Sequence, residues 1–346
     1  MFKDLPIDQC DLDKYTFVDV RSPSEYREMT IPGSLNIPVF DDEERAEVGT
    51  LYKQVSKEVA TDRGLEIFSS KLPRFINEFK KLEGEIVVFC WRGGMRSKAA
   101  ATFLDLMGIR TSRILGGVRA YRHWVLKGLE NIDMKPASFV LNGGTGTGKT
   151  AILKKLQEEG YPVLDIEGLA NHRGSIFGEI GLTANNQKTF DSLLLRELMK
   201  KQGSPFLLFE AESKRIGKVL LPDFLIREKE EAFHIFIEMP MKERVRHILD
   251  EYRLHEHHEE FVKAFRSIKR RIHSPIANEI EGELQERNYE RILELLIEYY
   301  YDPRYLHMWN QYPEDRKTTV KVNSIEDAYQ EIKKLIPQKS PLVSNH

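Results

Sequence analysis

Short apolar runs alternate with helical spacings of apolar residues in the first part of the chain. The runs at 15–21 and 86–89 predict buried strands, and 114–118 predicts a last strand and turn, because buried parallel strands are apolar without alternation. Apolar positions three and four apart predict a helix over 66–82 and another after the loop that begins at Cys90. This alternation predicts a parallel α/β sheet covered by helices.

A polar stretch at 131–136 separates this region from a second one with the same alternation. Four apolar runs predict its strands, at 138–141, 161–166, 205–210 and 232–237. A helix is predicted over 152–157, and the charged residues 241–301 predict a helical extension. We therefore expect two α/β domains and a disordered tail, over 1–132, 133–338 and 339–346 respectively.

The composition narrows the class of protein. The chain has 346 residues and a net charge of -2, so any basic surface for nucleic acid has to be local. Its two cysteines, Cys10 and Cys90, cannot form a disulfide framework of the secreted kind. No basic segment followed by an apolar core opens the chain, and no apolar run approaches the ~20 residues that span a bilayer. We therefore expect a cytoplasmic protein with no membrane partner.

The loop that begins at Cys90 (Cys-Trp-Arg-Gly-Gly-Met-Arg-Ser) lies between a predicted strand and a predicted helix. Such a loop directs backbone N–H groups and the positive end of the helix at its centre, which favours a reactive thiolate. Gly93 and Gly94 allow the backbone to curl, while Arg92 and Arg96 can bind an anion. The pattern predicts a nucleophile in an anion-binding ring. The alternative is that Cys90 is a small buried hydrophobe.

A second loop has the form of a nucleotide-type phosphate-binding loop, G-x-x-x-x-G-K-[ST], between a predicted strand and helix. Its amides would hold a diphosphate, Lys149 would neutralise the oxygens, and Thr150 could bind Mg²⁺. The residues predicted to bind diphosphate are Gly143, Gly144, Thr145, Gly146, Thr147, Gly148, Lys149 and Thr150. Glu210 ends a strand where NTPases carry a Mg²⁺-organising carboxylate, so an ATPase stays open as an alternative.

Two polar blocks, 164–175 and 209–217, follow predicted strands at the sheet edge where open α/β folds bind ligands. They supply the residues assigned to a tRNA or donor site, which are Asn171, His172, Arg173, Glu210, Glu212, Lys214 and Arg215. The cluster 255–259 (His-Glu-His-His-Glu) lacks the histidine spacing of a zinc-binding helix. We expect it to be a polar helical surface, and we predict no metal site there.

These motifs carry a resemblance to known families. Segments 17–26 and 31–38, with the Cys90 loop, resemble a rhodanese domain, a family that carries sulfur or selenium on the loop cysteine. Five residues separate Cys90 from Arg96, as in the phosphatase-like relatives of rhodaneses, and this leaves a phosphatase open for the domain alone. The whole chain resembles the tRNA 2-selenouridine synthases through both loops, the polar blocks and segments 49–54 and 300–305.

The resemblance implies an N-terminal rhodanese-like parallel-sheet domain followed by a P-loop NTPase-like α/β domain with a helical C-terminal region. It implies a tRNA substrate with 2-thiouridine at the wobble position, whose sulfur is alkylated from geranyl diphosphate and then replaced by selenium from selenophosphate. Cys90 would attack selenophosphate and carry selenium as a selanyl-sulfide, and the donor would be bound by Arg92, Gly93, Gly94 and Arg96. Both donors are co-substrates. No tightly bound cofactor is implied, and there is room for Mg²⁺.

A tRNA partner needs a local basic surface. The densest one falls on a predicted helix, at Lys263, Arg266, Lys269, Arg270 and Arg271. The alternative is a solvated helix whose charges are balanced by nearby glutamates. Two other functions also stay open: an ATP-dependent sulfurtransferase that acts on tRNA or another acceptor, and a non-enzymatic, nucleotide-gated binding module.

Overall fold

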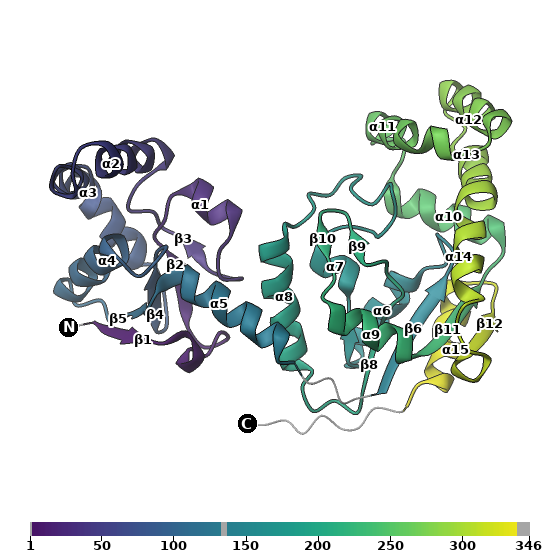
Figure 1. The fold of residues 1–346 in the computed structure, drawn as a ribbon, viewed down its shortest axis with the longest axis horizontal. Coiled ribbons are helices and arrows are strands. Elements are labelled where there is room, and N and C mark those ends of the chain that lie inside the picture. The colour runs from purple at the N-terminus through teal and green to yellow at the C-terminus, as the bar shows by residue number, and fades with distance from the viewer. Residues whose placement is uncertain (1, 133–136, 338–346) are drawn as a thin grey trace. The chain divides into compact units, whose positions relative to one another are not determined.

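The computed structural model describes residues 2–132 and 137–337, which form two compact units (Figure 1). The first contains Met1–Ile132 with Asp191–Leu195, and the second contains the rest of the chain. The tail expected to be disordered, 339–346, and most of the polar stretch 131–136 lie outside the described residues. No helix within the described ranges is both long and apolar enough to cross a bilayer.

The first unit contains a five-stranded parallel sheet in the order β1–β5–β4–β2–β3. Its strands are β1 (Lys3–Leu5), β2 (Thr16–Asp19), β3 (Leu35–Asn36), β4 (Ile86–Phe89) and β5 (Thr111–Ile114). All four residues of the central strand β4 are buried, which confirms the strand predicted from the apolar run. The chain leaves the carboxyl end of β4 at Cys90, so the cysteine loop lies at the centre of that edge of the sheet.

The helices of the first unit are α1 (Pro23–Glu28), α2 (Asp42–Gln54), α3 (Lys57–Phe79), α4 (Met95–Leu106) and α5 (Gly117–Glu130), with a 3₁₀ turn, η1 (Ile7–Gln9). Helix α3 begins earlier than predicted because Ser56 caps it: the Ser56 hydroxyl accepts a hydrogen bond from a first-turn N–H at 3.1 Å. The last strand also lies earlier than predicted. It ends at Ile114, and Gly116 and Gly117, with φ of 77° and 60°, turn the chain into α5.

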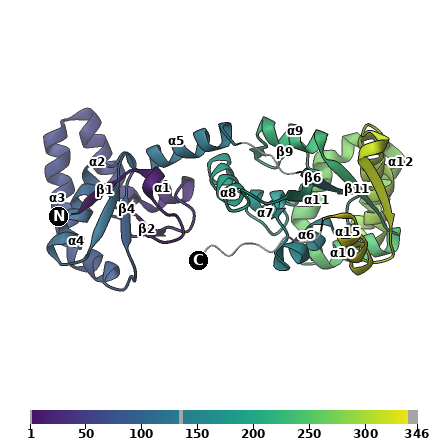
Figure 2. The ribbon, with the colours of Figure 1, turned by 90° about the horizontal axis from the view of Figure 1, so that it is seen from below.

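The second unit has its own five-stranded parallel sheet, in the order β12–β11–β6–β8–β7. Its strands are β6 (Ala137–Gly143), β7 (Val163–Leu164), β8 (Phe206–Glu210), β11 (Phe233–Glu238) and β12 (Lys317–Lys321). Four match predicted runs, whereas β12 was missed because only Val320 of this edge strand is buried. Helices α6 (Lys149–Glu158) and α15 (Ile325–Leu335) lie beside each other and pack their apolar faces into the same core as the sheet (Figure 2).

The chain between β11 and β12 is largely helical, as predicted. It contains α10 (Met241–Tyr252), α11 (His258–Ile268), α12 (Ser274–Glu286), α13 (Tyr289–Leu296), a π-helical turn η3 (Ile297–Tyr301) and α14 (Asp302–Trp309). These helices have a separate apolar core, which includes Phe261, Phe265 and Ile292. The remaining elements are α7 (Ile166–Ala170), α8 (Gln187–Lys200), α9 (Asp223–Glu231), the hairpin β9 (Arg215–Ile216) and β10 (Val219–Leu220), and the 3₁₀ turns η2 (Lys269–Arg271) and η4 (Glu314–Arg316).

The fold class predicted for the chain is confirmed by this architecture. Both five-stranded sheets are parallel and helices connect their strands. The helical region expected at the C-terminal end instead lies between β11 and β12 of the phosphate-loop sheet. In such sheets the loops at the carboxyl ends of the strands are where ligands bind. Both sequence motifs lie at such an edge.

Candidate functional site

The cysteine loop is compact and its thiol is shielded. Cys90 is 3% exposed, and its Sγ lies 3.2 Å from the hydroxyl oxygen of Ser97, which is fully buried in α4. Gly93 has a φ of +64°, a backbone conformation that favours glycine. The loop therefore places a sulfur atom against a hydroxyl at the start of a helix, where the helix dipole favours negative charge.

The start of α5 packs closely against the cysteine loop and holds it in place. The N–H groups of Val118 and Arg119, in the first turn of α5, donate hydrogen bonds of 2.9 and 3.1 Å to the carbonyls of Cys90 and Trp91. A Cβ atom on Gly117 would lie 2.2 Å from the Cys90 carbonyl oxygen. The loop can therefore adopt this shape only beside a residue with no side chain, a role that sequence analysis missed.

The arginines around the loop have different partners. Arg92 is exposed and has no ion-pair partner among the described residues. Arg96 is bound to Glu25 of α1 through both nitrogens of its fork, with one N···O distance of 3.1 Å. Arg113, which was not predicted, donates to the Gly93 carbonyl at 2.8 Å while it forms a bidentate pair with Asp4. Arg92 is thus the arginine that is free to meet an anion, and Arg113 holds the loop.

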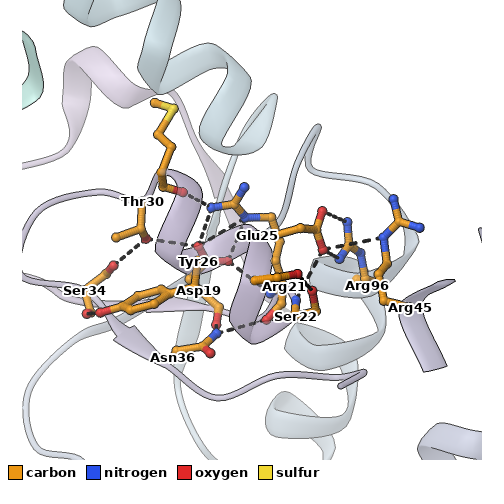
Figure 3. A network of polar contacts seen from close by, with 12 residues as sticks. Asp19, Arg21, Ser22, Glu25, Tyr26, Thr30, Ser34, Asn36, Arg45 and Arg96 are labelled. Carbon is orange, nitrogen blue, oxygen red and sulfur yellow. Dashed lines mark hydrogen bonds and ion pairs between the residues drawn. The ribbon is translucent and has the colours of Figure 1, made fainter. Parts of the chain in front are cut away.

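Glu25 is kept in position by a buried polar network after β2 (Figure 3). Arg21 donates to both carboxylate oxygens of Asp19, and Glu25 accepts from the Ser22 N–H at 3.2 Å in a capping box at the start of α1. Burial opposes ionisation of Glu25, but Arg96 and Arg45 together lower the pKa of its carboxyl. Glu25 is therefore a fixed negative charge that orients Arg96.

In the second unit, the phosphate loop has the geometry that its motif predicts. Gly143, Gly146 and Gly148 have positive φ values of 148°, 84° and 75°. A Cβ on Gly146 would lie 2.6 Å from a neighbouring backbone carbonyl oxygen. Lys149 Nζ lies over the loop, 3.0 Å from the Gly143 carbonyl and 5.5 Å from the centre of the Tyr305 ring. The ammonium group therefore lies over the cradle that a diphosphate would fill.

An ion pair that sequence analysis missed fixes the outer part of this loop. Arg244 of α10 donates to the Thr145 carbonyl at 2.9 Å and forms a bidentate pair with Asp302 at 2.8 and 2.6 Å. The Arg244 side chain is only 8% exposed. A bidentate guanidinium in this position holds the loop carbonyl rigidly.

Three glutamates gather beside Thr150. The Thr150 hydroxyl lies 2.8 Å from Glu167 Oε2 and 3.2 Å from Glu210 Oε2, and Glu212 completes a set of carboxylate oxygens within 4.8 Å of one another. A hydroxyl has one proton and can donate to only one carboxylate at a time. The sequence predicted Glu210 and Glu212 for this site but not Glu167, whose place depends on how α7 begins after β7.

Burial of these carboxyls shifts their protonation. It is the main cause that raises the pKa of Glu210 to about 8, with the charges of Glu212 and Asp165 adding to it. Burial likewise raises the pKa of Glu167 and that of Glu212. The set therefore shares protons near neutral pH or balances its charge with a cation. Carboxylate oxygens and a threonine hydroxyl are the hard donors that suit Mg²⁺, so these residues fit that ion.

We expect the stability of the Glu210→Gln variant, relative to the unchanged chain, to rise with pH in the presence of a chelator. The raised pKa of Glu210 means that its protonated form stabilises the folded chain below the unfolded pKa, and that this contribution is lost as pH rises through about 8. Mg²⁺ should stabilise the unchanged chain by about 2.7 kcal/mol at a hundredfold excess over its Kd, and more at high pH than at low pH. Thermal unfolding over a pH series measures both effects.

The control for this prediction is Glu290→Gln, at an exposed position of α13. It should follow the unchanged chain at every pH. An equal Mg²⁺ response in Glu210→Gln and in the unchanged chain would show that the ion binds elsewhere.

A pocket in front of the phosphate loop brings some of the predicted residues together. Arg173 and Glu212 line it with Lys149, and so do two tyrosines, Tyr252 and Tyr305. The Arg173 guanidinium lies 4.7 Å from the centre of the Tyr252 ring and pairs with a glutamate of α10 at 3.1 Å. Of the three residues predicted from the first polar block, Asn171, His172 and Arg173, only Arg173 therefore lines the pocket in front of the phosphate loop.

Five residues predicted for the tRNA or donor site do not line this pocket, as far as the described residues show: Glu210, which lies beside Thr150, and His172, Asn171, Lys214 and Arg215. His172 is buried between two glycines, where a Cβ on either Gly178 or Gly217 would lie 2.6 Å from its ring. Burial lowers the pKa of His172. Asn171 donates to a backbone carbonyl at 2.7 Å, Lys214 pairs with an aspartate at 2.9 Å, and Arg215 is an exposed residue of β9. The neighbours of His172 and Asn171 explain both as residues that hold the local fold together.

The basic patch is not carried by one helix, as the sequence predicted. Helix α11 ends at Ile268, so Lys263 and Arg266 are helical while Lys269, Arg270 and Arg271 form the 3₁₀ turn η2. Lys269 pairs with Glu281 at 2.7 Å, and the other four cations are exposed. The cluster 255–259 also differs from its prediction, because α11 begins only at His258.

Comparison with known proteins agrees with this architecture. Residues 4–123 match the family of rhodanese-like domains, and residues 136–336 match the family described as the tRNA 2-selenouridine synthase AAA domain. A tRNA 2-selenouridine synthase of Bdellovibrio bacteriovorus is 31% identical over 334 residues, which cover 84% of this chain and 87% of that one. The synthase of a Sulfurovum species is 32% identical over 326 residues, with 85% and 88% covered.

A third relative extends the agreement further. The tRNA 2-selenouridine synthase of Shewanella piezotolerans is 31% identical over 338 residues, which cover 88% of this chain and 90% of that one. The matches therefore include both units in the same order, with the cysteine loop in one and the phosphate loop in the other. This chain belongs to the tRNA 2-selenouridine synthase family.

Proposed function

We propose that the chain converts wobble 2-thiouridine in tRNA to 2-selenouridine, by S-geranylation from geranyl diphosphate followed by selenium transfer from selenophosphate. The relatives named above support the overall reaction. The observation that carries the two-step proposal is the presence of two different glycine-containing loops, one with the thiol of Cys90 and one with the ammonium group of Lys149. Each lies at the carboxyl edge of its own parallel sheet.

The first step uses the phosphate loop. The 2-thio sulfur attacks the first carbon of the geranyl group, so a C–S bond forms, the C–O bond to diphosphate breaks, and the uridine ring loses its N3 proton. Lys149 and the loop N–H groups stabilise the charge that gathers on the departing diphosphate. Mg²⁺ bound by Thr150 and the neighbouring glutamates would neutralise more of that charge.

Electron balance decides how Cys90 acts in the second step. Selenium has the oxidation level of selenide both in selenophosphate and in 2-selenouridine. A selanyl-sulfide on Cys90, the carrier expected from the resemblance, would need an oxidant to form with phosphate as the product and a reductant to discharge. We therefore place the attack at phosphorus, so that an S–P bond forms, the P–Se bond breaks and selenide is released.

Selenide then attacks C2 of the geranylated base. A C–Se bond forms, the C–S bond breaks, and sulfur leaves as geranyl thiol, while water hydrolyses the S–P bond to phosphate. Two features of the cysteine loop support attack at phosphorus. The spacing of Cys90 and Arg96 matches phosphatase-like loops, and the Ser97 hydroxyl, 3.2 Å from Cys90 Sγ, can donate to the sulfur when phosphate departs.

The exposed cations of the basic patch would contact tRNA phosphates. Lys263, Arg266, Arg270 and Arg271 are available for this role, whereas Lys269 is held by Glu281. Phosphate contacts of this kind weaken as the salt concentration is raised. Binding releases counterions from the nucleic acid, and their release is less favourable when the solution already holds many ions.

The proposed function is tested by product analysis of tRNA carrying 2-thiouridine. We expect S-geranyl-2-thiouridine with geranyl diphosphate alone, and 2-selenouridine with release of geranyl thiol when selenophosphate is added. Mass spectrometry of the digested nucleosides detects each product. Modification that depends on ATP and thiosulfate, and not on geranyl diphosphate, would instead establish the ATP-dependent sulfurtransferase.

A further inference from the structure

A second pocket in the helical region is lined almost entirely by apolar side chains. Its cavity is narrow in this structure, with a volume of about 10 Å³, so a ligand would have to displace some of the wall side chains. The walls come from the segment after α7 and from α10, α11, α13 and the chain that joins them, and they include Phe177, Ile248, Leu254, Phe261, Leu293 and Leu296. No lysine, arginine, aspartate or glutamate lines this pocket, as far as the described residues show. A ligand here would be hydrocarbon.

This apolar pocket adjoins the phosphate pocket. Four residues line both of them: Thr145 in the phosphate loop, Ser175, and Ile248 and Tyr252 on α10. The Thr145 carbonyl is fixed by Arg244, so the boundary between the two pockets is held by the same ion pair that shapes the loop. A molecule with its diphosphate in the loop would therefore meet the apolar pocket directly, and its tail would enter between side chains of the helical core.

The backbone of one wall is also unusual. The turn Ile297–Tyr301 is π-helical, and both Ile297 and Tyr301 line the pocket. π-Helical turns are rare, and they occur most often at functional sites, because the extra residue changes which side chains face the ligand.

We propose that this apolar pocket binds the hydrocarbon tail of the prenyl diphosphate whose diphosphate lies on the phosphate loop. The assignment rests on the proposed function, because it takes the donor from that reaction and adds the site for its tail. Recognition is by burial of hydrocarbon, so affinity depends on the number of isoprene units. In this arrangement the phosphate loop binds the diphosphate, and the apolar pocket between the helices binds the prenyl chain.

The test measures binding to the full chain by calorimetry, with neither tRNA nor a selenium donor present. Geranyl diphosphate should bind at least about tenfold more tightly than dimethylallyl diphosphate, which is one isoprene unit shorter, and inorganic diphosphate should bind more weakly still. Leu293→Ala should weaken geranyl diphosphate about tenfold and leave inorganic diphosphate unchanged. The series of ligands on the unchanged chain keeps the test valid even if this variant folds poorly.

Leu295→Ala is the matched control. Leu295 lies on the same helix as Leu293 and both are buried, at 1% and 4% exposure, but it does not line the pocket. It should lower the thermal transition by a similar amount and leave the preference for geranyl over dimethylallyl diphosphate unchanged.

Three outcomes would overturn the assignment: equal affinity for the three ligands, equal weakening of geranyl diphosphate by the two alanine variants, or tighter binding of ATP that Leu293→Ala abolishes. The last outcome would show that the pocket takes a nucleotide base. Chain-length-dependent binding without geranylation of tRNA would refute the proposed function and retain the tail site. Geranylation with no dependence of binding on chain length would do the reverse.

Discussion

Replacing Cys90 with alanine is expected to stop selenium incorporation while S-geranylation of tRNA continues. In the proposed second step the Cys90 sulfur takes the phosphoryl group from selenophosphate. The other thiol of the chain, Cys10, lies 3.4 Å from the Pro6 carbonyl. Removal of a nucleophile that forms a covalent intermediate typically costs at least about 1,000-fold in rate. Single-turnover conversion of geranylated tRNA to 2-selenouridine measures this loss.

Two further measurements decide the role of Cys90. Cys10→Ala is the control, because burial raises the pKa of that thiol to about 11 and keeps it unreactive, and both steps should proceed as before. Incubation of the chain with selenophosphate alone should leave a phosphoryl group on Cys90, detectable by mass. An added selenium atom would instead favour the selanyl-sulfide carrier, and selenium incorporation by Cys90→Ala would remove this cysteine from the mechanism.

Replacing Lys149 with alanine is expected to have the opposite pattern. In the proposed first step Lys149 stabilises the departing diphosphate, so geranylation should fall by about 100- to 1,000-fold when its ammonium group is lost. Selenium transfer to tRNA that already carries the geranyl group should be unaffected, since it does not use the phosphate loop. Separate assays of the two steps, each with its own tRNA substrate, measure the difference.

Lys155→Ala is a suitable control for this experiment. Lys155 lies on the same helix, α6, but it pairs with Glu326 at 2.5 Å on the surface and does not line the phosphate pocket. Its removal should leave geranylation within about twofold of the unchanged chain, since exposed ion pairs contribute little. Full geranylation activity in Lys149→Ala would mean that the diphosphate is held elsewhere.

The sequence predicted those parts of the site in which the candidate side chains and the loop that positions them lie in one short segment. The cysteine loop and the phosphate loop each carry their functional residues within a few positions, between a strand and a helix. The apolar run of β4 and the glycines of the phosphate loop determine both structures locally. Short-range rules are enough for such motifs.

The missed residues act across the fold. Arg113 reaches the cysteine loop from the neighbouring strand, and Gly117 contacts it from the start of α5. Glu167 and Arg244 reach the phosphate loop in the same way. Nothing in the sequence around Arg113, Gly117 or Arg244 marks a ligand site, because their positions follow from strand order and helix packing. Glu167 lies within the polar block 164–175, but it was not singled out there. Strand β12 was missed for a different reason: an edge strand with one buried residue shows little hydrophobic periodicity.

The helices α10 to α14 are inserted between two strands, β11 and β12, that lie side by side in the sheet. Pairing of these strands sets the ends of the insertion and leaves its interior free to change length and packing. Lys149 and the glycines of the phosphate loop belong to the sheet and its first helix, whereas most of the walls of the apolar pocket belong to the inserted helices. In the proposed enzyme, the preference for a lipid chain and the chemistry of the leaving group are thus encoded mostly by separate stretches of the polypeptide.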